Sequence, residues 1–267
     1  MIIKSLLNRN NSLKNIYSGE DCYIFGNGSS IKKYDLKKFS KKYIFSCGWL
    51  FLHKDYQYLD ILADFEMHPG IFFPFWKNEY NKKFELNKIN KIFKTRNRLT
   101  KPKHFFTSLI NFPALLKYKN VHYLYHFGKK KFDFKYIDPS DKFSLMENSL
   151  YAMVGVASFM GFKNIYLVGM DYLLNKPLVG HFYENFRKEI DQSHELKLKN
   201  KSFFENFNKK INFKLMVSDE SHNSFLQTIE YSEYFNSNYE ENSNLDIILE
   251  NDLNLLNKAN LKYQIFD

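Results

Sequence analysis

Two glycines enclose an asparagine early in the chain, in a setting that suits an anionic ligand. Gly26, Asn27 and Gly28 follow the apolar run of residues 22–25, and a helix is expected after them over residues 31–39. Glycine at such a turn lets the backbone approach a phosphate or ribose, and the N–H groups of a following helix favour negative charge. The third glycine of the dinucleotide fingerprint is missing. The turn therefore predicts a nucleotide site, with a tight turn that binds nothing as the alternative.

Two aspartates stand at the ends of predicted strands. Asp64 ends the strand expected over residues 60–63, and Asp171 closes the segment after the strand expected over residues 164–168. Because ligands of open α/β sheets bind at the carboxyl edge, both side chains are expected to face one crevice. The alternative is that they cap turns or helices. Neither belongs to an Asp-x-Asp pair, and no His/Cys cluster has zinc spacing, so no metal ligand is assigned.

Histidine and tyrosine side chains follow the second aspartate. His181 and His194 lie in the segment after it, and a histidine can remove a proton from a hydroxyl near neutral pH. Tyr172 and Tyr183 can donate hydrogen bonds to a leaving phosphate. Each histidine, judged singly, is explained as well by a surface or packing role. The histidines interpreted as structural are His53, His104, His122, His126 and His222.

The elements that would position these groups alternate between strands and helices. This order predicts an α/β fold, with a Rossmann-like, mostly parallel sheet flanked by helices. We expect one domain over residues 1–267, with a small lid at residues 173–200. Strands are expected at residues 22–25, 43–47, 60–63, 104–109, 121–127, 164–168 and 213–217, and helices at residues 31–39, 149–160, 203–209, 221–235 and 245–261.

Composition limits the partners. The formal net charge is +10, which attracts phosphates, nucleic acid or anionic membranes. No zinc-finger spacing or RNA-binding aromatic motif is present, so a nucleotide substrate or an anionic lipid surface fits better than nucleic acid. The high aromatic content, 18%, is typical of AT-rich codon usage.

Cysteine usage and hydropathy bear on location. Cys22 and Cys47 both lie in apolar strands, which indicates buried free thiols and a cytoplasmic location. There is no apolar run of transmembrane length. Apolar residues recur at helical spacing within residues 2–16, which predicts a short surface helix, with a membrane-touching helix as the alternative.

The order of these motifs resembles a known group. Residues 22–30 (CYIFGNGSS), 60–69 (DILADFEMHP), 149–171 and 180–183 (GHFY) carry the resemblance, and the third segment is the most specific. The chain resembles the bacterial sialyltransferases of glycosyltransferase family 42 and related proteins of surface-polysaccharide loci. The matching segments keep the family's order and span most of the chain.

The resemblance implies a GT-A-like variant of the Rossmann fold, a CMP-activated donor and inverting transfer without a metal or other cofactor. It implies that the glycine–asparagine–glycine turn contacts the nucleotide, and that Asn148 and Ser149 contact the donor phosphate and sugar. It also implies a histidine base. Spacing back from the strand at residues 213–217 indicates His194, whereas His181 has the stronger local motif.

The sequence departs from the family at several positions. The family's arginine before the long helix is absent, since residues 145–147 are LME, and one family tyrosine falls at Leu173, beside Tyr172. These losses leave a different activated sugar open. Gly48 and His68 take the places of two family asparagines, and the donor-binding candidates besides the glycine–asparagine–glycine turn, Asn148 and Ser149 are Ser29, Gly48, Asp64, His68 and Asp171.

The expected acceptor is a growing surface glycan or glycolipid, such as lipooligosaccharide or capsule. That acceptor would bring the protein to the inner face of the cytoplasmic membrane, and a homo-oligomer is compatible with the sequence. Two other functions are open: an enzyme of the pterin pyrophosphokinase-like or flagellin-modification type, and a non-catalytic nucleotide- or glycan-binding domain.

Overall fold

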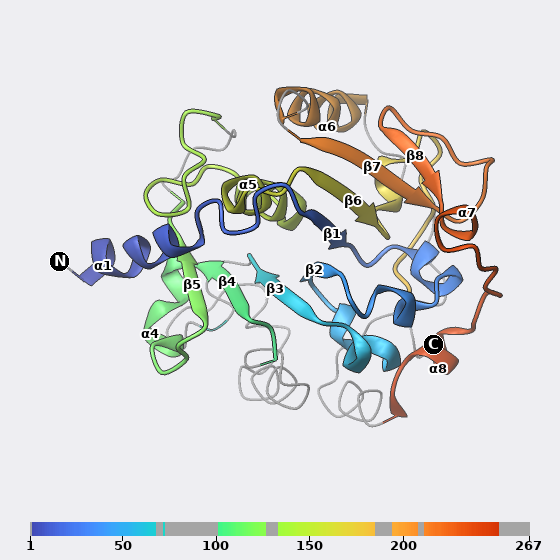
Figure 1. Cartoon of the computed structure of the whole chain (residues 1–267), viewed down its shortest axis with the longest axis horizontal. Helices are drawn as coiled ribbons and strands as arrows, with labels where there is room; N and C mark the ends of the chain where they lie inside the picture. Colours follow the sequence, from blue (N-terminus) through green and yellow to red (C-terminus); the bar gives the residue numbers. More distant parts are fainter. Residues whose placement is uncertain are drawn as a thin grey trace.

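One parallel sheet organises the molecule. The computed structural model describes residues 2–67, 72, 101–126, 133–184, 194–207 and 211–250. Its eight strands lie in the order β5-β4-β3-β2-β1-β6-β7-β8, and every neighbouring pair is parallel (Figure 1). The strands are β1 (Asp21–Phe25), β2 (Tyr43–Cys47), β3 (Ile61–Glu66), β4 (His104–Ser108), β5 (Val121–Leu124), β6 (Asn164–Val168), β7 (Asn212–Val217) and β8 (Gln227–Glu230).

The direction in which the sheet grows reverses between β1 and β6. Strands β1 to β5 are added one after another toward one edge, and the chain then returns to place β6 on the other side of β1. At such a switch point the loops after the two central strands diverge and leave a crevice at the carboxyl edge. The expected fold class is confirmed. A ligand site is expected at the carboxyl ends of β1 and β6.

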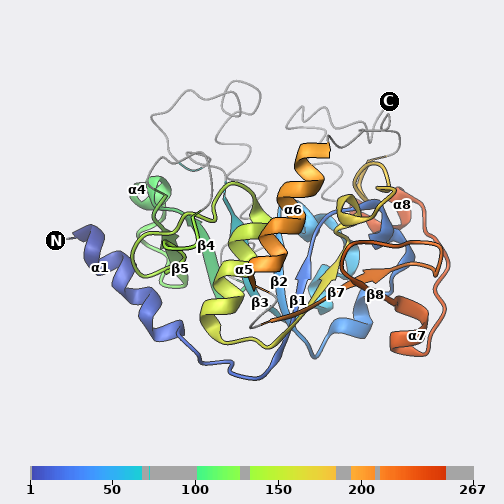
Figure 2. The ribbon, with the colours of Figure 1, turned by 90° about the horizontal axis from the view of Figure 1, so that it is seen from above.

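Helices cover both faces of the sheet, which explains why its central strands are apolar throughout. Helices α5 (Ser149–Met160) and α6 (His194–Phe207) lie over one face, as Figure 2 shows. The other face packs against short 3₁₀ helices and α7 (Tyr231–Phe235). The 3₁₀ helices are η2 (Ser29–Lys33), η3 (Leu36–Phe39), η4 (Leu50–Leu52) and η5 (Lys54–Tyr58).

The sequence around α5 specifies both of its ends. Asn148 caps the helix, because its side-chain oxygen accepts a hydrogen bond from the backbone N–H of Tyr151 at 2.8 Å. Gly161 ends it in the left-handed conformation, at φ +92°. Nine of the twelve residues are buried, so the helix packs against the sheet and α6 together. The helix expected over residues 149–160 is confirmed.

The N-terminal segment lies along β5. Helix α1 (Ile2–Asn8) runs into η1 (Arg9–Leu13), as expected for a short surface helix. The Asn10 side-chain amide donates to the Tyr123 carbonyl at 2.9 Å and to the Pro139 carbonyl at 2.7 Å. Next to this end lie η6 (Leu109–Asn111) and α4 (Phe112–Leu115). Buried side-chain hydrogen bonds therefore fasten the N-terminal segment to the sheet edge.

Four expected elements differ from the structure in extent or type. The helix expected at 31–39 is two 3₁₀ helices, because Tyr34 is extended at φ −120° and Asp35 caps a new start. Helix α6 begins at His194, so the last seven residues of the expected lid are helical. The helix expected at 221–235 contains the edge strand β8 before α7. Strand β3 continues past Asp64 to Glu66.

Local patterns explain these errors. Residues 227–230 (QTIE) are too few and too polar to show a period, and they become a strand only by pairing with β7. Of the C-terminal helix expected over 245–261, the structure describes α8 (Asn244–Ile247), and residues beyond 250 lie outside the described residues. The strand expected to reach residue 127 ends at Leu124.

Candidate functional site

A cavity of about 450 Å³ lies at the carboxyl edge of the sheet, at the switch point between β1 and β6. The turns after both strands line it, together with the N-terminus of α5, two residues of α6 and the segment 177–181. Asn27 and Asp171 therefore border one pocket, as the sequence predicted. From these elements the wall is formed by Gly26, Asn27, Gly28, Cys47, Asn148, Ser149, Leu150, Gly169, Met170, Asp171, Tyr172, Pro177, Leu178, Val179, Gly180, His181, Leu196 and Asn200.

The glycines of the first turn are needed because the turns after β1 and β6 touch. The Gly28 N–H donates to the Gly169 carbonyl at 2.9 Å. A Cβ on Gly28 would lie 2.4 Å from Asp171 Oδ2, and one on Gly26 would lie 2.4 Å from the Gly169 carbonyl oxygen. The sequence reasoning expected glycine for close approach to a ligand. In the structure the close approach is to the turn after β6, at Gly169 and Asp171.

Asn27 lines the cavity, and its amide oxygen is buried without a hydrogen-bond partner in the part of the chain that the structure describes. Its Nδ2 donates to the Cys47 carbonyl at 3.2 Å, which fixes the orientation of the amide. Its Oδ1 is buried and accepts no hydrogen bond from the described residues. Buried acceptors of this kind are uncommon in folded proteins, so a ligand that donates a hydrogen bond fits here.

Gly48 supports that amide from behind and is absent from the cavity wall. It is left-handed, at φ +60°, and a Cβ there would lie 2.5 Å from Asn27 Nδ2. A side chain at this position would push the amide of Asn27 toward the cavity. The observed orientation of the Asn27 amide therefore requires a glycine at position 48.

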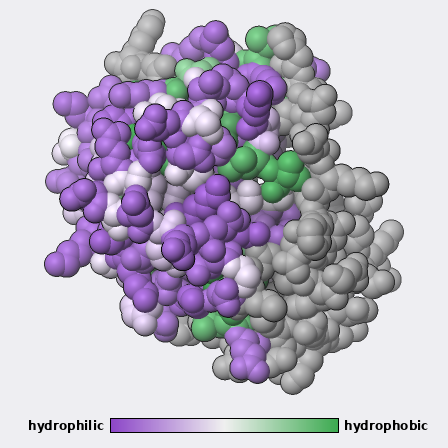
Figure 3. Space-filling view, turned by 90° about the vertical axis from the view of Figure 1, so that its right-hand side faces the viewer, coloured by the Kyte–Doolittle hydropathy of each residue, from purple (hydrophilic) through white to green (hydrophobic). Residues whose placement is uncertain are grey.

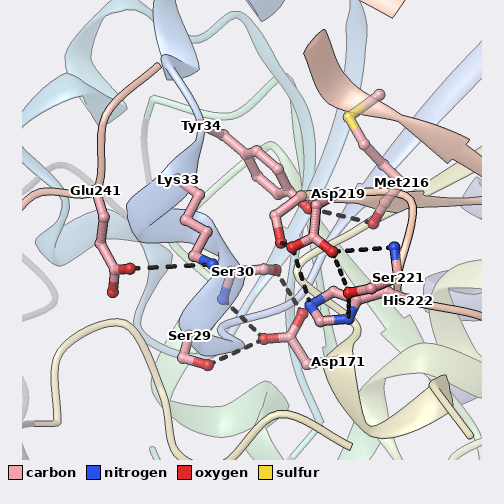
Figure 4. A network of polar contacts seen from close by, with 11 residues as sticks. Ser29, Ser30, Lys33, Tyr34, Asp171, Met216, Asp219, Ser221, His222 and Glu241 are labelled. Carbon is pink, nitrogen blue, oxygen red and sulfur yellow. Dashed lines mark hydrogen bonds and ion pairs between the residues drawn. The ribbon is translucent and has the colours of Figure 1, made fainter. Parts of the chain in front are cut away.

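Asp171 binds the first 3₁₀ helix. Its carboxylate accepts hydrogen bonds from the Ser30 N–H at 2.8 Å, from the Ser30 hydroxyl, and from the Ser29 hydroxyl at 3.4 Å (Figure 4). Burial raises the pKa of Asp171 above its usual range, although these bonds and the nearby His222 act in the opposite direction. The carboxylate thus joins the ends of β1 and β6, which is the capping alternative considered from the sequence.

A second polar group lies beyond β7. The Asp219 carboxylate accepts from the Ser221 N–H at 3.1 Å and from the Ser221 hydroxyl, and it lies 3.5 Å from His222 Nε2 (Figure 4). The Ser221 hydroxyl, chiefly, and the nearby His222 lower the pKa of Asp219. The group closes the loop after β7.

Besides Gly48, two described donor-binding candidates are not at the cavity wall. Asp64 lies inside β3, where its carboxylate accepts from the Ser46 hydroxyl at 2.9 Å and from the Phe65 N–H at 3.0 Å. Because the strand continues to Glu66, this side chain stays within the sheet. Ser29 hydrogen bonds to Asp171 without lining the cavity. His68 lies outside the described residues.

The N-terminus of α5 faces the cavity. Asn148, Ser149 and Leu150 all line it. As the first residues of a helix, Ser149 and Leu150 present backbone N–H groups that no helical carbonyl can accept. The helix dipole adds positive potential at this end, so an anion such as a phosphate is favoured here.

His181 lines the opposite wall and is oriented by a carboxylate. Its Nδ1 lies 3.0 Å from Glu184 Oε2, and the same oxygen accepts the His181 backbone N–H at 3.0 Å. The ring stacks on Tyr183, with centroids 5.1 Å apart and planes 2° apart. A histidine whose Nδ1–H donates to a carboxylate keeps its Nε2 lone pair as the basic site, which is the arrangement of a general base.

The other catalytic candidates differ in position. Tyr172 lines the cavity, and burial raises its pKa, so its hydroxyl stays protonated and can donate a hydrogen bond. Tyr183 is buried behind His181 and does not line the cavity. His194 begins α6 two residues before the cavity residue Leu196, and its side chain is not among those the structure describes.

The sequence reasoning missed Asn200 and Leu196, because α6 was taken as part of a lid. Asn200 is buried, and its Oδ1 accepts from the Tyr151 hydroxyl at 2.7 Å. A signal was present, since residues 196, 200, 203, 204 and 207 recur at helical spacing and Asn200 is the one polar side chain among leucine and phenylalanine. A lone asparagine on a buried helix face indicates a polar partner.

Neither metal ligands nor membrane spans emerge from the residues described. No group of three or more His, Cys, Asp and Glu side chains there is placed to hold a metal ion. Within the same ranges, no helix is long and apolar enough to cross a membrane.

The chain is similar to known proteins in its structure, whereas its sequence matches none. No protein-family model and no curated protein matches the sequence. Among solved structures, the chain is similar to a MAf glycosyltransferase from Magnetospirillum magneticum AMB-1, at TM-score 0.50 and 12% identity. That match covers 96% of this chain and 42% of the other, so the chain spans less than half of that protein.

Two sialyltransferases from Campylobacter jejuni are also similar. CstII, in complex with cytidine-5'-monophosphate, matches at TM-score 0.48 and 19% identity, over 91% of this chain and 99% of that one. The monofunctional α-2,3-sialyltransferase Cst-I matches at TM-score 0.47 and 17% identity, over 91% and 94%. At such identities a likeness concerns the fold, and the chemistry must be argued from the cavity itself.

Proposed function

We propose that the chain is an inverting glycosyltransferase that takes a sialic-acid-like sugar from a CMP-activated donor and passes it to a surface glycan or glycolipid. The observation that carries this proposal is the shared cavity at the switch point, which Asn27 lines and where its amide oxygen accepts no hydrogen bond from the described residues. Its volume, about 450 Å³, lies within the range of small-molecule sites.

The polar groups around the cavity suit the parts of such a donor. Asn27 Oδ1 accepts a hydrogen bond from an amino or hydroxyl group of the nucleoside. The N–H groups at the start of α5, with Asn148 and Ser149, receive the phosphate. Tyr172 donates a hydrogen bond to the departing phosphate. Backbone dipoles and a phenol thus offset the negative charge that develops on the leaving group, and the transfer proceeds without a divalent metal.

A histidine removes the proton of the acceptor hydroxyl as that oxygen attacks the anomeric carbon. His181 is favoured by its place at the wall and by its hydrogen bond to Glu184. His194 is favoured by the spacing that the family resemblance implies. We therefore propose both as candidate bases, with Tyr183 positioning the ring of His181 and the segment 174–184 as the inner part of the lid.

A ligand screen tests the nucleotide. Thermal unfolding is measured with CMP, UDP, GDP and ATP, each with and without magnesium, because a ligand that binds only the folded state raises the Tm. CMP is expected to give the largest shift, unchanged by EDTA, and Asn27→Ala is expected to abolish it. A shift with ATP that requires magnesium would instead support the pyrophosphokinase-like alternative.

Turnover tests the base. Donor hydrolysis and transfer from a CMP-sugar are measured for His181→Gln, His194→Gln and Glu184→Gln. Loss of a positioned base typically lowers the rate by about 10²–10⁴-fold. The variant that loses kcat while still binding CMP identifies the base. Normal turnover in both histidine variants would refute the assignment, and CMP binding without hydrolysis or transfer in the wild type would support a non-catalytic domain.

A further inference from the structure

Charge is separated between the two edges of the sheet. Residues 2–19 and 101–126, which include α1, β4, α4 and the outer strand β5, contain seven Lys or Arg residues and no Asp or Glu. Residues 211–250, which include β7, the outer strand β8, α7 and α8, contain eight Asp or Glu residues and one Lys. Strands β5 and β8 are the two outer strands, so the parts of these segments around them lie at opposite edges of the sheet.

The positive end also exposes large apolar side chains. Ile2 and Ile3 of α1 are 69% and 52% exposed, and Leu116, just after α4, is 57% exposed. Both ribbon views place α1 and α4 at this end, beside β5 (Figures 1 and 2). Lys4, Arg9, Lys117 and Lys119 lie among them in sequence and are exposed.

This surface is held in place by the fold. The Arg9 guanidinium donates to the Lys119 carbonyl, and Asn10 binds the backbone of β5. Leu7, on the inner face of α1, is buried in the core. The helix is thus presented in a defined position.

Nearby negative charge is small. The loop over residues 133–143 approaches this end through the bond from Asn10 to the Pro139 carbonyl. It carries three aspartates and two lysines, a net charge of −1, and the Asp133 and Asp138 carboxylates accept local hydrogen bonds. Over residues 2–19, 101–126 and 133–143 the formal charge therefore stays positive.

We propose that the α1–α4 end, defined by Ile2, Ile3, Leu116, Lys117 and Lys119, docks on an anionic phospholipid surface. Peripheral binding of this kind needs both an apolar insertion and a basic surround, since either alone gives weak attachment. The opposite edge of the sheet, at β8, then faces away from the membrane. Figure 3 views that opposite side, where the coloured surface is mainly hydrophilic.

The lysines would also attract a nucleic acid, but a nucleic acid has no apolar layer in which exposed isoleucine and leucine side chains could be buried. The choice of lipid rests on those apolar groups. It is independent of the donor specificity of the cavity, so failure of one proposal leaves the other intact.

Vesicle binding tests the surface. The full chain is co-sedimented with vesicles of phosphatidylcholine alone, and with vesicles containing phosphatidylglycerol, at about 0.1 M salt. Binding is expected only with phosphatidylglycerol and should weaken at higher salt. Ile2→Asp/Ile3→Asp and Lys117→Glu/Lys119→Glu should each lower the partition coefficient at least about tenfold. Unfolding temperatures should stay unchanged, because these side chains are exposed.

Matched controls lie elsewhere on the molecule. Leu198 is 54% exposed on α6, and Lys38 and Lys41 are exposed near η3. Leu198→Asp and Lys38→Glu/Lys41→Glu should bind the anionic vesicles as the wild type does. The proposal is overturned if the wild type ignores phosphatidylglycerol, if the controls lose as much binding as the α1–α4 variants, or if the lysines matter for RNA binding and not for vesicles.

Discussion

Three neutral groups form a buried chain at the β5 edge, and acid should break it. Asn10 donates through Nδ2 to two carbonyls, so its Oδ1 must accept from His122 Nδ1 at 2.9 Å. His122 Nε2 is then the acceptor for His104 Nδ1 at 3.0 Å. His104 Nε2 is buried and has no hydrogen-bond partner among the described residues. Protonating His122 would place two N–H groups against each other.

The magnitude follows from the pKa values. Burial lowers the pKa of His104 to about 4, with help from Lys103, and lowers that of His122 to about 3, with help from His104 and Arg9. In the unfolded chain both return to about 6.5. As the pH falls below 6.5, the unfolded state binds protons that the folded state refuses, so stability is lost. Between pH 7.5 and pH 5.0, each of the two histidines therefore lowers the free energy of unfolding by about 2 kcal/mol.

Urea denaturation at steps between pH 7.5 and 5.0 measures this loss. His104→Gln/His122→Gln should make the loss of unfolding free energy smaller by about 4 kcal/mol than in the wild type. His53, whose pKa burial lowers to about 3, contributes equally to both proteins and cancels. His126→Gln is the control for replacing a histidine near β5, since that side chain is exposed and lies outside the buried chain of hydrogen bonds.

One result would refute the reasoning. If the double variant loses as much stability as the wild type over this range, the two histidines are not held neutral by the fold. Equal m-values in all variants are required for the comparison, because a changed m-value means a changed denatured state.

Further outcomes concern the cavity. Gly28→Ala should lower the free energy of unfolding by about 1–3 kcal/mol in urea denaturation, because the new methyl group meets Asp171. Gly48→Ala should cost about 1–2 kcal/mol for its left-handed backbone and should raise the Kd for CMP by displacing Asn27, which calorimetry measures; an unchanged Kd contradicts the role given to that amide. Asn200→Leu should cost about 1 kcal/mol by removing an acceptor of the Tyr151 hydroxyl, and Tyr151→Phe in the same chain should recover most of the loss.

Much of the fold could be predicted from local pattern. Strand β2 matches its expected residues, β6 likewise, and α5 spans the residues expected for the long helix. These elements carry their own signals, since a buried parallel strand is apolar throughout and a helix needs caps at its ends. Strand β8 has no such signal, because its identity depends on the partner β7.

The site was predictable only in part. The turn at Asn27 and the segment ending at Asp171 were expected to share a pocket, and both line the cavity. The pairing of His181 with Glu184 and the part played by Asn200 were not foreseen. The inward position of Asp64 was missed as well, because β3 continues two residues beyond it.

By itself the sequence determined where the strands and turns fall and which side chains follow them, because backbone preference and burial pattern act over a few residues. The tertiary structure decided which of those groups meet. The Ser30–Asp171 bond joins residues 141 positions apart, and the Gly28–Gly169 contact is equally distant in the chain. Such contacts depend on the order of strands in the sheet, and strand order is set by how the whole core packs rather than by any local run of residues.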